Sequence, residues 1–170
     1  MTLGELNALR DGEAAQVFTA CCGANRWVLE MVRRRPYSSI DHVVDTANIV
    51  WCEAGENDWR EAFDHHPRIG EVRSAAAQDQ RAAGWSSSEQ SGAAVAQADA
   101  KRALAAMNAK YEARFGHIYL VCATGLSADA LLAIARSRLD NDPATELRVA
   151  AEEQRKITEL RLRKLLTEAP

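Results

Sequence analysis

Residues that begin α-helices and residues that end them alternate along most of this chain, and this alternation constrains its fold more than any other feature. Thr2 and Glu5 have the spacing of a capping box ahead of a short first helix. Asp11 is a favourable N-cap for a second helix, which we expect to run to about Cys22 and to end at a left-handed Gly23. The start of the chain therefore predicts consecutive helices joined by short loops.

The same signals continue through the next part of the chain. Asn25 can cap a third helix, which must end by Pro36 because the residue before a proline avoids the helical conformation. Ser39 opens a fourth helix that Gly55 ends, and the apolar residues between them recur at steps of three and four. Asn57 then begins a short fifth helix.

The second half of the chain predicts longer helices. Ser86 begins a helical stretch that reaches about Phe115, and Ser127 begins another. Asp142 followed by a proline is a strong start signal for the last helix, which we expect to continue to about Thr167.

One short run differs from this helical pattern. Residues 118–123 read Ile-Tyr-Leu-Val-Cys-Ala and resemble a strand, but the sequence offers no second strand to pair with them. We therefore expect this run to be extended, buried backbone. The sequence predicts an all-α fold: a single compact domain over residues 1–170, with about seven to nine helices and one short extended buried segment near 118–123.

Composition narrows the class of protein. The 170 residues can bury about 70% of the unfolded chain's surface in one domain. The net charge of −3 leaves no basic excess to displace counterions, so we expect no nucleic-acid partner. The apolar runs are shorter than the ~18 residues that span a bilayer, so we expect no membrane partner. Neither end carries a recognisable targeting signal, and we therefore expect a cytoplasmic protein.

The cysteines and histidines give little support for a metal site. Cys21 and Cys22 are adjacent, and Cys52 and Cys122 stand alone, so no CxxC pair for zinc or dithiol chemistry exists. We expect these cysteines to be buried free thiols. The sequence also lacks an HExxH motif and a pair of histidines four residues apart. We therefore expect no metal site.

His66 is the first candidate for chemistry. His65 and His66 are adjacent and cannot share a helix face, because neighbouring residues on a helix point about 100° apart. His66 precedes Pro67, which ends the helix there and can leave the imidazole projecting into a cleft. Taken alone, the His-Pro pair is more typical of an ordinary helix terminator than of a catalytic site.

The second and third candidates are Glu89 and Arg161. Ser86 and Glu89 have capping-box spacing, but a helix start also suits a carboxylate or an imide-like ring, and Glu89 could fix the tautomer of a histidine. Arg161 lies on the apolar stripe of the last helix, one turn beyond Ile157. A guanidinium in that position either extends outward to solvent or serves a buried anion. Spacing alone leaves both questions open.

These motifs together resemble the 2-oxo-4-hydroxy-4-carboxy-5-ureidoimidazoline (OHCU) decarboxylase family of uric acid breakdown, over essentially the whole chain. The resemblance rests on the order and spacing of Arg35-Pro36-Tyr37, His66-Pro67-Arg68-Ile69-Gly70, Ser86-Ser87-Ser88-Glu89-Gln90, Tyr111-Glu112-Ala113-Arg114-Phe115-Gly116, Val121-Cys122-Ala123 and Glu159-Leu160-Arg161-Leu162. It implies an all-α, cofactor-independent homodimer that converts the small-molecule substrate OHCU to (S)-allantoin and carbon dioxide.

The resemblance also implies roles for individual residues. His66 matches the catalytic histidine of the family, Glu89 its carboxylate partner and Arg161 its active-site arginine. Positions that match the lining of the substrate pocket are Pro67, Ser86, Gln90, Tyr119, Leu120, Val121, Cys122 and Ala123. We therefore expect an imidazole, a carboxylate and a guanidinium from three remote stretches to converge on one small heterocycle. The alternatives from the residues alone are an all-α ligand-binding or regulatory module and a metal-dependent hydrolase.

Overall fold

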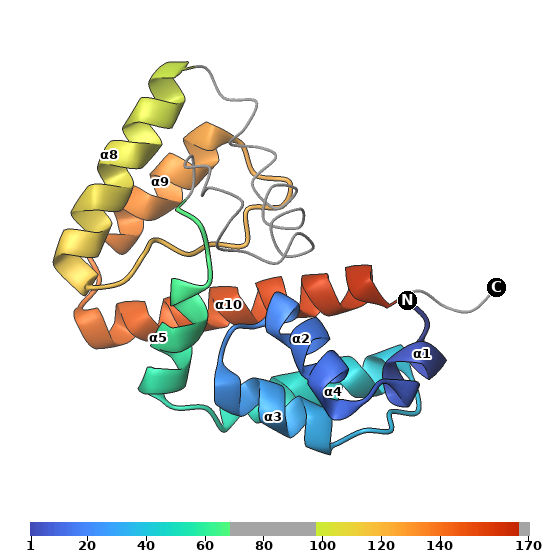
Figure 1. Ribbon diagram of the computed structural model, residues 1–170. Helices are drawn as coiled ribbons and strands as arrows, with labels where there is room; N and C mark the ends of the chain where they lie inside the picture. Colours follow the sequence, from blue (N-terminus) through green and yellow to red (C-terminus); the bar gives the residue numbers. More distant parts are fainter. Residues whose placement is uncertain (69–97, 167–170) are drawn as a thin grey trace. The chain divides into compact units, whose positions relative to one another are not determined.

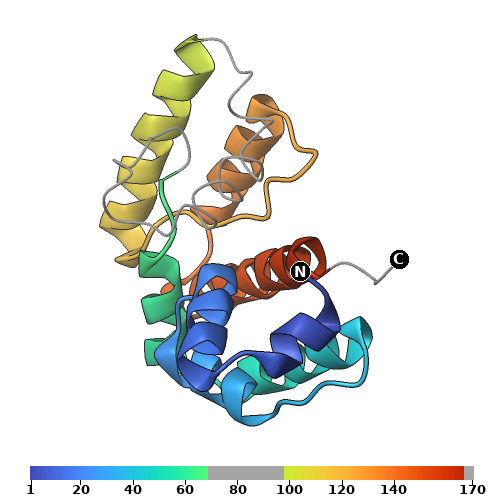
Figure 2. The same ribbon diagram turned by 45° about the vertical axis from the view of Figure 1, so that its right-hand side comes forward.

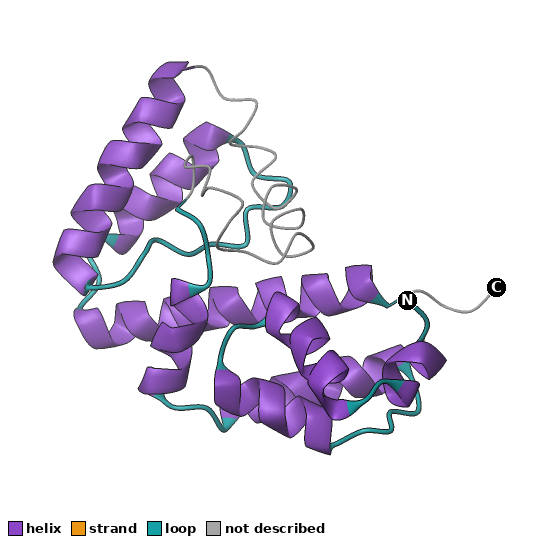
Figure 3. Cartoon of the chain, in the orientation of Figure 1, coloured by secondary structure: helices purple, strands orange, loops and turns teal. Residues whose placement is uncertain are grey.

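The structure is a computed structural model, and it describes residues 1–68 and 98–166. Every regular element in these residues is an α-helix, and Figure 3 shows the helices joined by loops with no strand among the described residues. The predicted all-α class is confirmed, and the described residues hold eight helices where seven to nine were expected along the chain.

Helix lengths follow the start and stop signals closely. Five short helices occupy the first part of the chain: α1 (Leu3–Ala8), α2 (Asp11–Cys21), α3 (Asn25–Arg33), α4 (Ile40–Cys52) and α5 (Glu56–Asp64). Three further helices follow: α8 (Ala98–Phe115), α9 (Ala128–Arg138) and α10 (Pro143–Leu165), of which α8 and α10 are longer than any of the first five. Figure 1 labels all eight along the chain.

The chain divides into two compact units by its internal contacts. The first, here called the terminal unit, comprises Met1–His65 and Arg155–Pro170, and the second, the central unit, comprises His66–Gln154. Helix α10 supplies residues to both units, because the division falls between Gln154 and Arg155.

Helix α3 is at the centre of the terminal unit, where it packs against α2, α4 and α5. Trp27 of α3 is buried, and its indole Nε1 donates a hydrogen bond of 3.1 Å to the carbonyl oxygen of Ala47 in α4. The Phe18 ring of α2 meets the Trp27 ring edge-on, with centroids 6.0 Å apart. The Trp27 side chain therefore connects α3 to both α2 and α4, and its one polar group is hydrogen-bonded.

Several helix starts in this unit are confirmed, and others are displaced by one or two residues. The Thr2 capping box and the Ser39 cap are present as predicted. The predicted caps Asp11 and Asn25 are instead the first helical residues. Asn25 donates its side chain and backbone N–H groups to Glu61, at 2.5 and 3.0 Å. A contact with a distant helix therefore uses the amide that would otherwise cap α3.

The fifth helix also starts earlier than predicted. Gly55, not Asn57, is the N-cap of α5, and its backbone N–H donates to Asp58 Oδ2 at 2.9 Å. The residue that was expected to end α4 therefore begins α5. A carboxylate three residues into the helix stabilises this start.

Gly23 has a different role from the predicted left-handed helix end. The C-cap residue of α2 is Cys22, with an extended backbone, and among the described glycines Gly116 and Gly125 are the ones with positive φ. Gly23 lies directly against the side chain of His65. A Cβ added at Gly23 would come within 2.1 Å of His65 Cγ. Close approach, not backbone conformation, requires glycine here.

Gly23→Ala should therefore lower the free energy of unfolding by about 1–3 kcal/mol, the usual cost of adding a methyl group to a packed site. Urea denaturation followed by circular dichroism measures this change. Gly12→Ala is the matched control, because nothing lies within 4 Å of a Cβ at Gly12. Alanine within helix α2 should leave stability unchanged or raise it by up to about 1 kcal/mol. Equal effects of the two substitutions would contradict the close-approach explanation.

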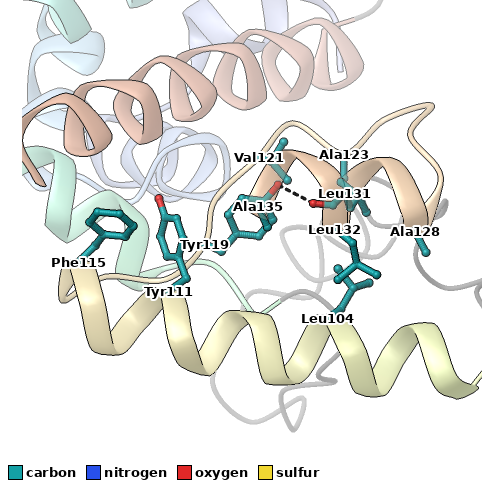
Figure 4. Close-up of a cluster of buried hydrophobic side chains, with 10 residues drawn as sticks. All are labelled: Leu104, Tyr111, Phe115, Tyr119, Val121, Ala123, Ala128, Leu131, Leu132 and Ala135. Carbon is teal, nitrogen blue, oxygen red and sulfur yellow. Dashed lines mark hydrogen bonds between the residues drawn. The ribbon is translucent and has the colours of Figure 1, made fainter. Parts of the chain in front are cut away.

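The central unit is built on α8 and α9, which pack against each other and lie side by side in Figures 1 and 2. Figure 4 shows their apolar side chains turned toward residues of the segment between them. This core cluster consists of Leu104, Tyr111, Phe115, Tyr119, Val121, Ala123, Ala128, Leu131, Leu132 and Ala135. Side chains of α8, of the segment that follows it and of α9 therefore form one hydrophobic core.

The predicted extended segment is confirmed. Residues 118–123 form neither helix nor strand, and Tyr119, Leu120, Val121 and Ala123 are buried. Gly116 makes this possible, because its φ of +70° turns the chain away from the end of α8. Its N–H still donates to the Glu112 carbonyl oxygen at 2.9 Å, which closes the last turn of the helix.

The start signals of the later helices are confirmed where the structure describes them. Ser127 caps α9, and Asp142 Oδ1 accepts from the N–H groups of Ala144 and Thr145 at 3.1 and 3.0 Å. Hydrogen bonds from Thr145 and Ala144 lower the pKa of Asp142. The predicted helix from Ser86 to about Phe115 is confirmed over α8, and the predicted cap Ser86 lies outside the described residues.

The prediction of buried thiols is correct for some of the cysteines. Cys21 and Cys22 are buried, Cys122 is half-buried and Cys52 is exposed, and all are free thiols. The Cys52 prediction was wrong because this residue is the last of α4, next to the buried face formed by Val50 and Trp51 but not on it. Burial raises the pKa of Cys22 to about 12, so this sulfur is a thiol at neutral pH.

Membrane insertion is not indicated by the helices. Within residues 1–68 and 98–166, none is both long enough and apolar enough to cross a bilayer.

Candidate functional site

His66 lies just beyond the end of α5, in the central unit. The helix ends at Asp64, and His65 is its C-cap, as expected for a helix that stops ahead of Pro67. His66 is 5% exposed, so an ionisable residue has been removed from water. Its Nε2 atom lies 2.8 Å from Gln154 Oε1. The imidazole is therefore held inside the unit and does not project into solvent.

Gln154 comes from α10 and is fully buried. Burial of a polar amide is costly unless it forms hydrogen bonds, and the contact with His66 meets this need. The two residues are 88 positions apart in sequence. This hydrogen bond between distant parts of the sequence therefore holds the imidazole of His66, the predicted catalytic residue, in place.

The residue after Pro67 is also fixed. Arg68 forms a two-pronged ion pair with Glu112 of α8: Nε lies 2.5 Å from Oε1, and Nη2 lies 2.8 Å from Oε2. Pro67 itself is buried. A paired guanidinium and carboxylate in this geometry hold the chain in one orientation. The His66–Arg68 stretch is thus anchored at both of its ends within the central unit.

The extended segment 119–123 is held by side chains from the helices around it. Arg138 Nη1 donates to the Leu120 carbonyl oxygen at 2.8 Å, and the Cys122 N–H donates to Glu153 Oε2 at 2.8 Å. The Tyr119 hydroxyl donates to the Leu131 carbonyl oxygen at 3.1 Å. Because this segment has no strand partner, the contacts to Leu120 and Cys122 satisfy backbone groups that a sheet would otherwise pair, and the Tyr119 hydroxyl ties the segment to α9.

The arginine that binds this segment, Arg138, also forms a buried ion pair with Glu146. Arg138 of α9 and Glu146 of α10 are 6% and 0% exposed, and Arg138 Nη2 lies 2.5 Å from Glu146 Oε1. The Tyr111 hydroxyl donates to the same carboxylate, and Asn141 Nδ2 donates to Oε2 at 2.7 Å. Burial raises the pKa of Tyr111, so its hydroxyl stays protonated and remains a donor.

Arg161 belongs to the terminal unit and is buried, with 3% of its surface exposed. Of the two possibilities for this residue, extension of the guanidinium into solvent is excluded. Nη1 lies 3.4 Å from the carbonyl oxygens of both Ala20 and Cys21. These carbonyls are at the C-terminal end of α2, where the helix dipole favours a positive charge.

The structure places the predicted site residues as follows. His66, Pro67 and residues 119–123 belong to the central unit and Arg161 to the terminal unit. Ser86, Glu89 and Gln90 lie outside the described residues. The convergence of imidazole, carboxylate and guanidinium therefore stays a prediction. Among the residues that the structure describes, no three His, Cys, Asp or Glu side chains are grouped as a metal site would require.

Most of this chain matches the model of a known family. The family model described as OHCU decarboxylase matches residues 7–163. The chain belongs to the OHCU decarboxylase family. The predicted family is thus confirmed over nearly the full length of the sequence.

Two relatives illustrate the range of this family. The chain is 34% identical, over 148 residues, to the uric acid degradation bifunctional protein TTL of Arabidopsis thaliana. That match covers 87% of this chain but 46% of the relative, so the chain spans about half the length of the plant protein. The 2-oxo-4-hydroxy-4-carboxy-5-ureidoimidazoline decarboxylase of Haloferax volcanii is 28% identical, with 95% and 94% of the two chains covered.

Solved structures share the fold. A crystal structure of OHCU decarboxylase in the presence of (S)-allantoin matches with a TM-score of 0.76 at 32% identity, and the match covers 88% of this chain and 96% of that one. An (S)-allantoin synthase structure matches with a TM-score of 0.71 at 15% identity, covering 98% and 54%. At that identity the second match supports the fold alone.

Sequence reasoning did not single out Gln154, Glu146 or Arg138. A signal for two of them was present, because Glu146 and Gln154 lie at helical spacing on the same stripe of α10 as Ala150, Ile157 and Arg161. A polar residue on the apolar stripe of a helix indicates that it has a buried hydrogen-bond or ion-pair partner, but the pattern does not identify that partner. Arg138 carried the same signal, because it lies at helical spacing from Ala128, Leu131 and Ala135 on the buried face of α9.

Proposed function

We propose that this chain is an OHCU decarboxylase, which converts OHCU to (S)-allantoin and carbon dioxide in the degradation of uric acid. The observation that carries this proposal is the match to a solved OHCU decarboxylase at 32% identity over 96% of that chain. The buried, hydrogen-bonded His66 supports it from the structure, because the reaction requires a positioned proton carrier.

The reaction needs proton transfers and a confined site. Loss of carbon dioxide breaks the bond between the carboxylate and the hydroxylated ring carbon. The electron pair forms a C=C bond to the ureido-bearing carbon, and the nitrogen of the former C=N bond takes up a proton from solvent. The resulting enol-like species loses its hydroxyl proton and gains a proton on one face of the ureido-bearing carbon, which sets the S configuration. The substrate's own C=N bond accepts the electrons. Exclusion of water would favour conversion of a charged carboxylate to a neutral gas.

Each predicted residue has a place in this chemistry. His66 would take the hydroxyl proton and return a proton to the ring, and Glu89 would stabilise the imidazolium that forms between these steps. Arg161 would orient the charged substrate. The pocket would be lined by Pro67, Ser86, Gln90 and the backbone of Tyr119, Leu120, Val121, Cys122 and Ala123.

Further parts of the proposal concern organisation. The family match over residues 7–163 supports a single catalytic domain across residues 1–170. We also propose that the enzyme is a homodimer located in the cytoplasm and that it acts on OHCU without a metal or organic cofactor. The resemblance between this sequence and the family supports the homodimer and the absence of an organic cofactor.

A direct assay tests the proposed activity. The purified chain should speed the decay of freshly generated OHCU, followed by ultraviolet absorbance, and circular dichroism should show that the allantoin formed is the S enantiomer. A ligand-binding module would instead shift the melting temperature without speeding decay. Loss of activity on treatment with a chelator, with recovery on addition of a metal, would indicate a metal-dependent hydrolase.

A further inference from the structure

The contact between His66 and Gln154 constrains the position of the proton on the imidazole. A neutral histidine carries one N–H group, on either Nδ1 or Nε2. Gln154 presents its amide oxygen, which is purely an acceptor, 2.8 Å from His66 Nε2. The ring nitrogen that faces an acceptor is the one that keeps the proton.

We propose that Gln154 is a positioning residue that holds His66 as the Nε2–H tautomer, so that Nδ1 is the nitrogen that takes the substrate's hydroxyl proton. This inference rests on the proposed decarboxylation and extends it to a residue that the sequence motifs did not identify. It assigns the choice of tautomer to Gln154 and leaves Glu89 to stabilise the imidazolium. Gln154 acts through His66 and does not itself transfer a proton.

The chemistry of the amide suits this role. A carboxylate against the same nitrogen would also select the Nε2–H tautomer, but its charge would favour the imidazolium, which cannot accept a proton. A neutral amide selects the tautomer without adding a charge. Because both side chains are buried, little solvent is present to compete for the ring N–H.

The position of Gln154 also connects the imidazole to the extended segment. Its neighbour in α10, Glu153, accepts the Cys122 N–H at 2.8 Å. Consecutive residues of one helix therefore hold the ring and a backbone group of the predicted pocket wall, all within the central unit. A side chain on a rigid helix fixes a partner more closely than one on a loop does.

Nitrogen NMR measures the tautomer without any need for turnover. In ¹⁵N-labelled protein, the ring nitrogens of His66, assigned by comparison with the His66→Gln variant, should show a protonated Nε2 and an unprotonated Nδ1 at neutral pH. In Gln154→Leu, which removes the acceptor at similar volume, this preference should be lost. A protonated Nδ1 in the wild-type protein would overturn the proposal.

Kinetics provide a second readout. Gln154→Leu should lower kcat for OHCU by about tenfold or more with little change in KM, because a smaller fraction of the enzyme holds the productive tautomer. Gln154→Glu restores an acceptor and should recover part of kcat, while the acid limb of its pH–rate profile moves to higher pH because the added charge favours the imidazolium. Unchanged kcat in Gln154→Leu would contradict the proposal.

The matched control is Asn108→Leu, which removes another buried amide from the same unit. It should leave the His66 tautomer and the pH–rate profile unchanged, whatever its effect on stability. If Asn108→Leu changes both as Gln154→Leu does, the effect is general destabilisation and the proposal fails. If the wild-type chain does not decarboxylate OHCU, the proposed function fails, and the NMR measurement still decides whether Gln154 sets the tautomer.

Discussion

His66→Ala should lower kcat for OHCU by about 10²- to 10⁴-fold, the range expected when a general acid–base group is removed. His66 is the one residue to which the proposed chemistry assigns both proton transfers, and its buried ring is held at a defined distance from Gln154. Steady-state decay of OHCU, measured by absorbance, gives the rate. Far-ultraviolet circular dichroism should show unchanged helical content.

The control for this substitution is His42→Ala. His42 is exposed on α4, where its Nδ1 accepts a hydrogen bond from the Ser38 N–H at 3.2 Å. The variant should keep the wild-type rate. His66→Gln adds a second test, because it keeps a polar side chain in the buried site but cannot cycle a proton near neutral pH. Near-wild-type rates in both His66 variants would refute the role of this residue.

Local signals in the sequence predict much of this fold, and particular residues show why. The caps at Ser39, Ser127 and Asp142 form within three residues of chain, so neighbouring sequence determines them. The segment 118–123 is also predictable, because it is apolar and has no strand partner. In these places local preference and tertiary packing favour the same structure.

Predictions failed where a distant residue decides the structure. Asn25 has the chemistry of an N-cap, but its amide binds Glu61, 36 positions away. Gly23 has the chemistry of a left-handed helix end, but it is required by the approach of His65. Sequence periodicity gives the face of a helix on which a residue lies, not the group that packs against it.

The same limit applies to the candidate site. Sequence motifs identified His66 and Arg161, but the helical stripe of α10 left open whether Arg161 extends into solvent, and the structure shows that it is buried. The stripe also contained Gln154, but nothing local indicated that it would meet a histidine 88 residues earlier. A buried polar partner of a predicted site residue has to be found from coordinates.

The Arg138–Glu146 pair shows how strongly such a contact can affect stability. Arg138 Nε and Nη2 lie 2.7 and 2.5 Å from Glu146 Oε1, and the guanidinium carbon lies 5.1 Å from the centre of the Tyr119 ring. Both charges are almost completely removed from water, so each depends on the other for compensation. The same guanidinium binds the Leu120 carbonyl oxygen, so the pair also holds the extended segment.

Arg138→Met should therefore lower the free energy of unfolding by about 3–5 kcal/mol, because it leaves the Glu146 carboxylate buried without its counter-charge. Urea denaturation monitored by circular dichroism measures this loss. Arg163→Met is the matched control, since Arg163 forms an ion pair of 3.0 Å with Asp41 while 47% of its side chain is exposed. An exposed pair contributes about 0–1 kcal/mol, so this variant should stay within that range.

The double variant Arg138→Met/Glu146→Leu separates the cost of an unpaired charge from the value of the pair itself. Removal of both charges eliminates the desolvated carboxylate, and apolar replacements of similar size are often neutral or stabilising. The double variant should therefore be more stable than Arg138→Met alone, although Tyr111 and Asn141 each lose an acceptor at Glu146. If the single variant loses less than about 1 kcal/mol, or if the double variant is less stable than the single one, Arg138 and Glu146 do not compensate each other in this way.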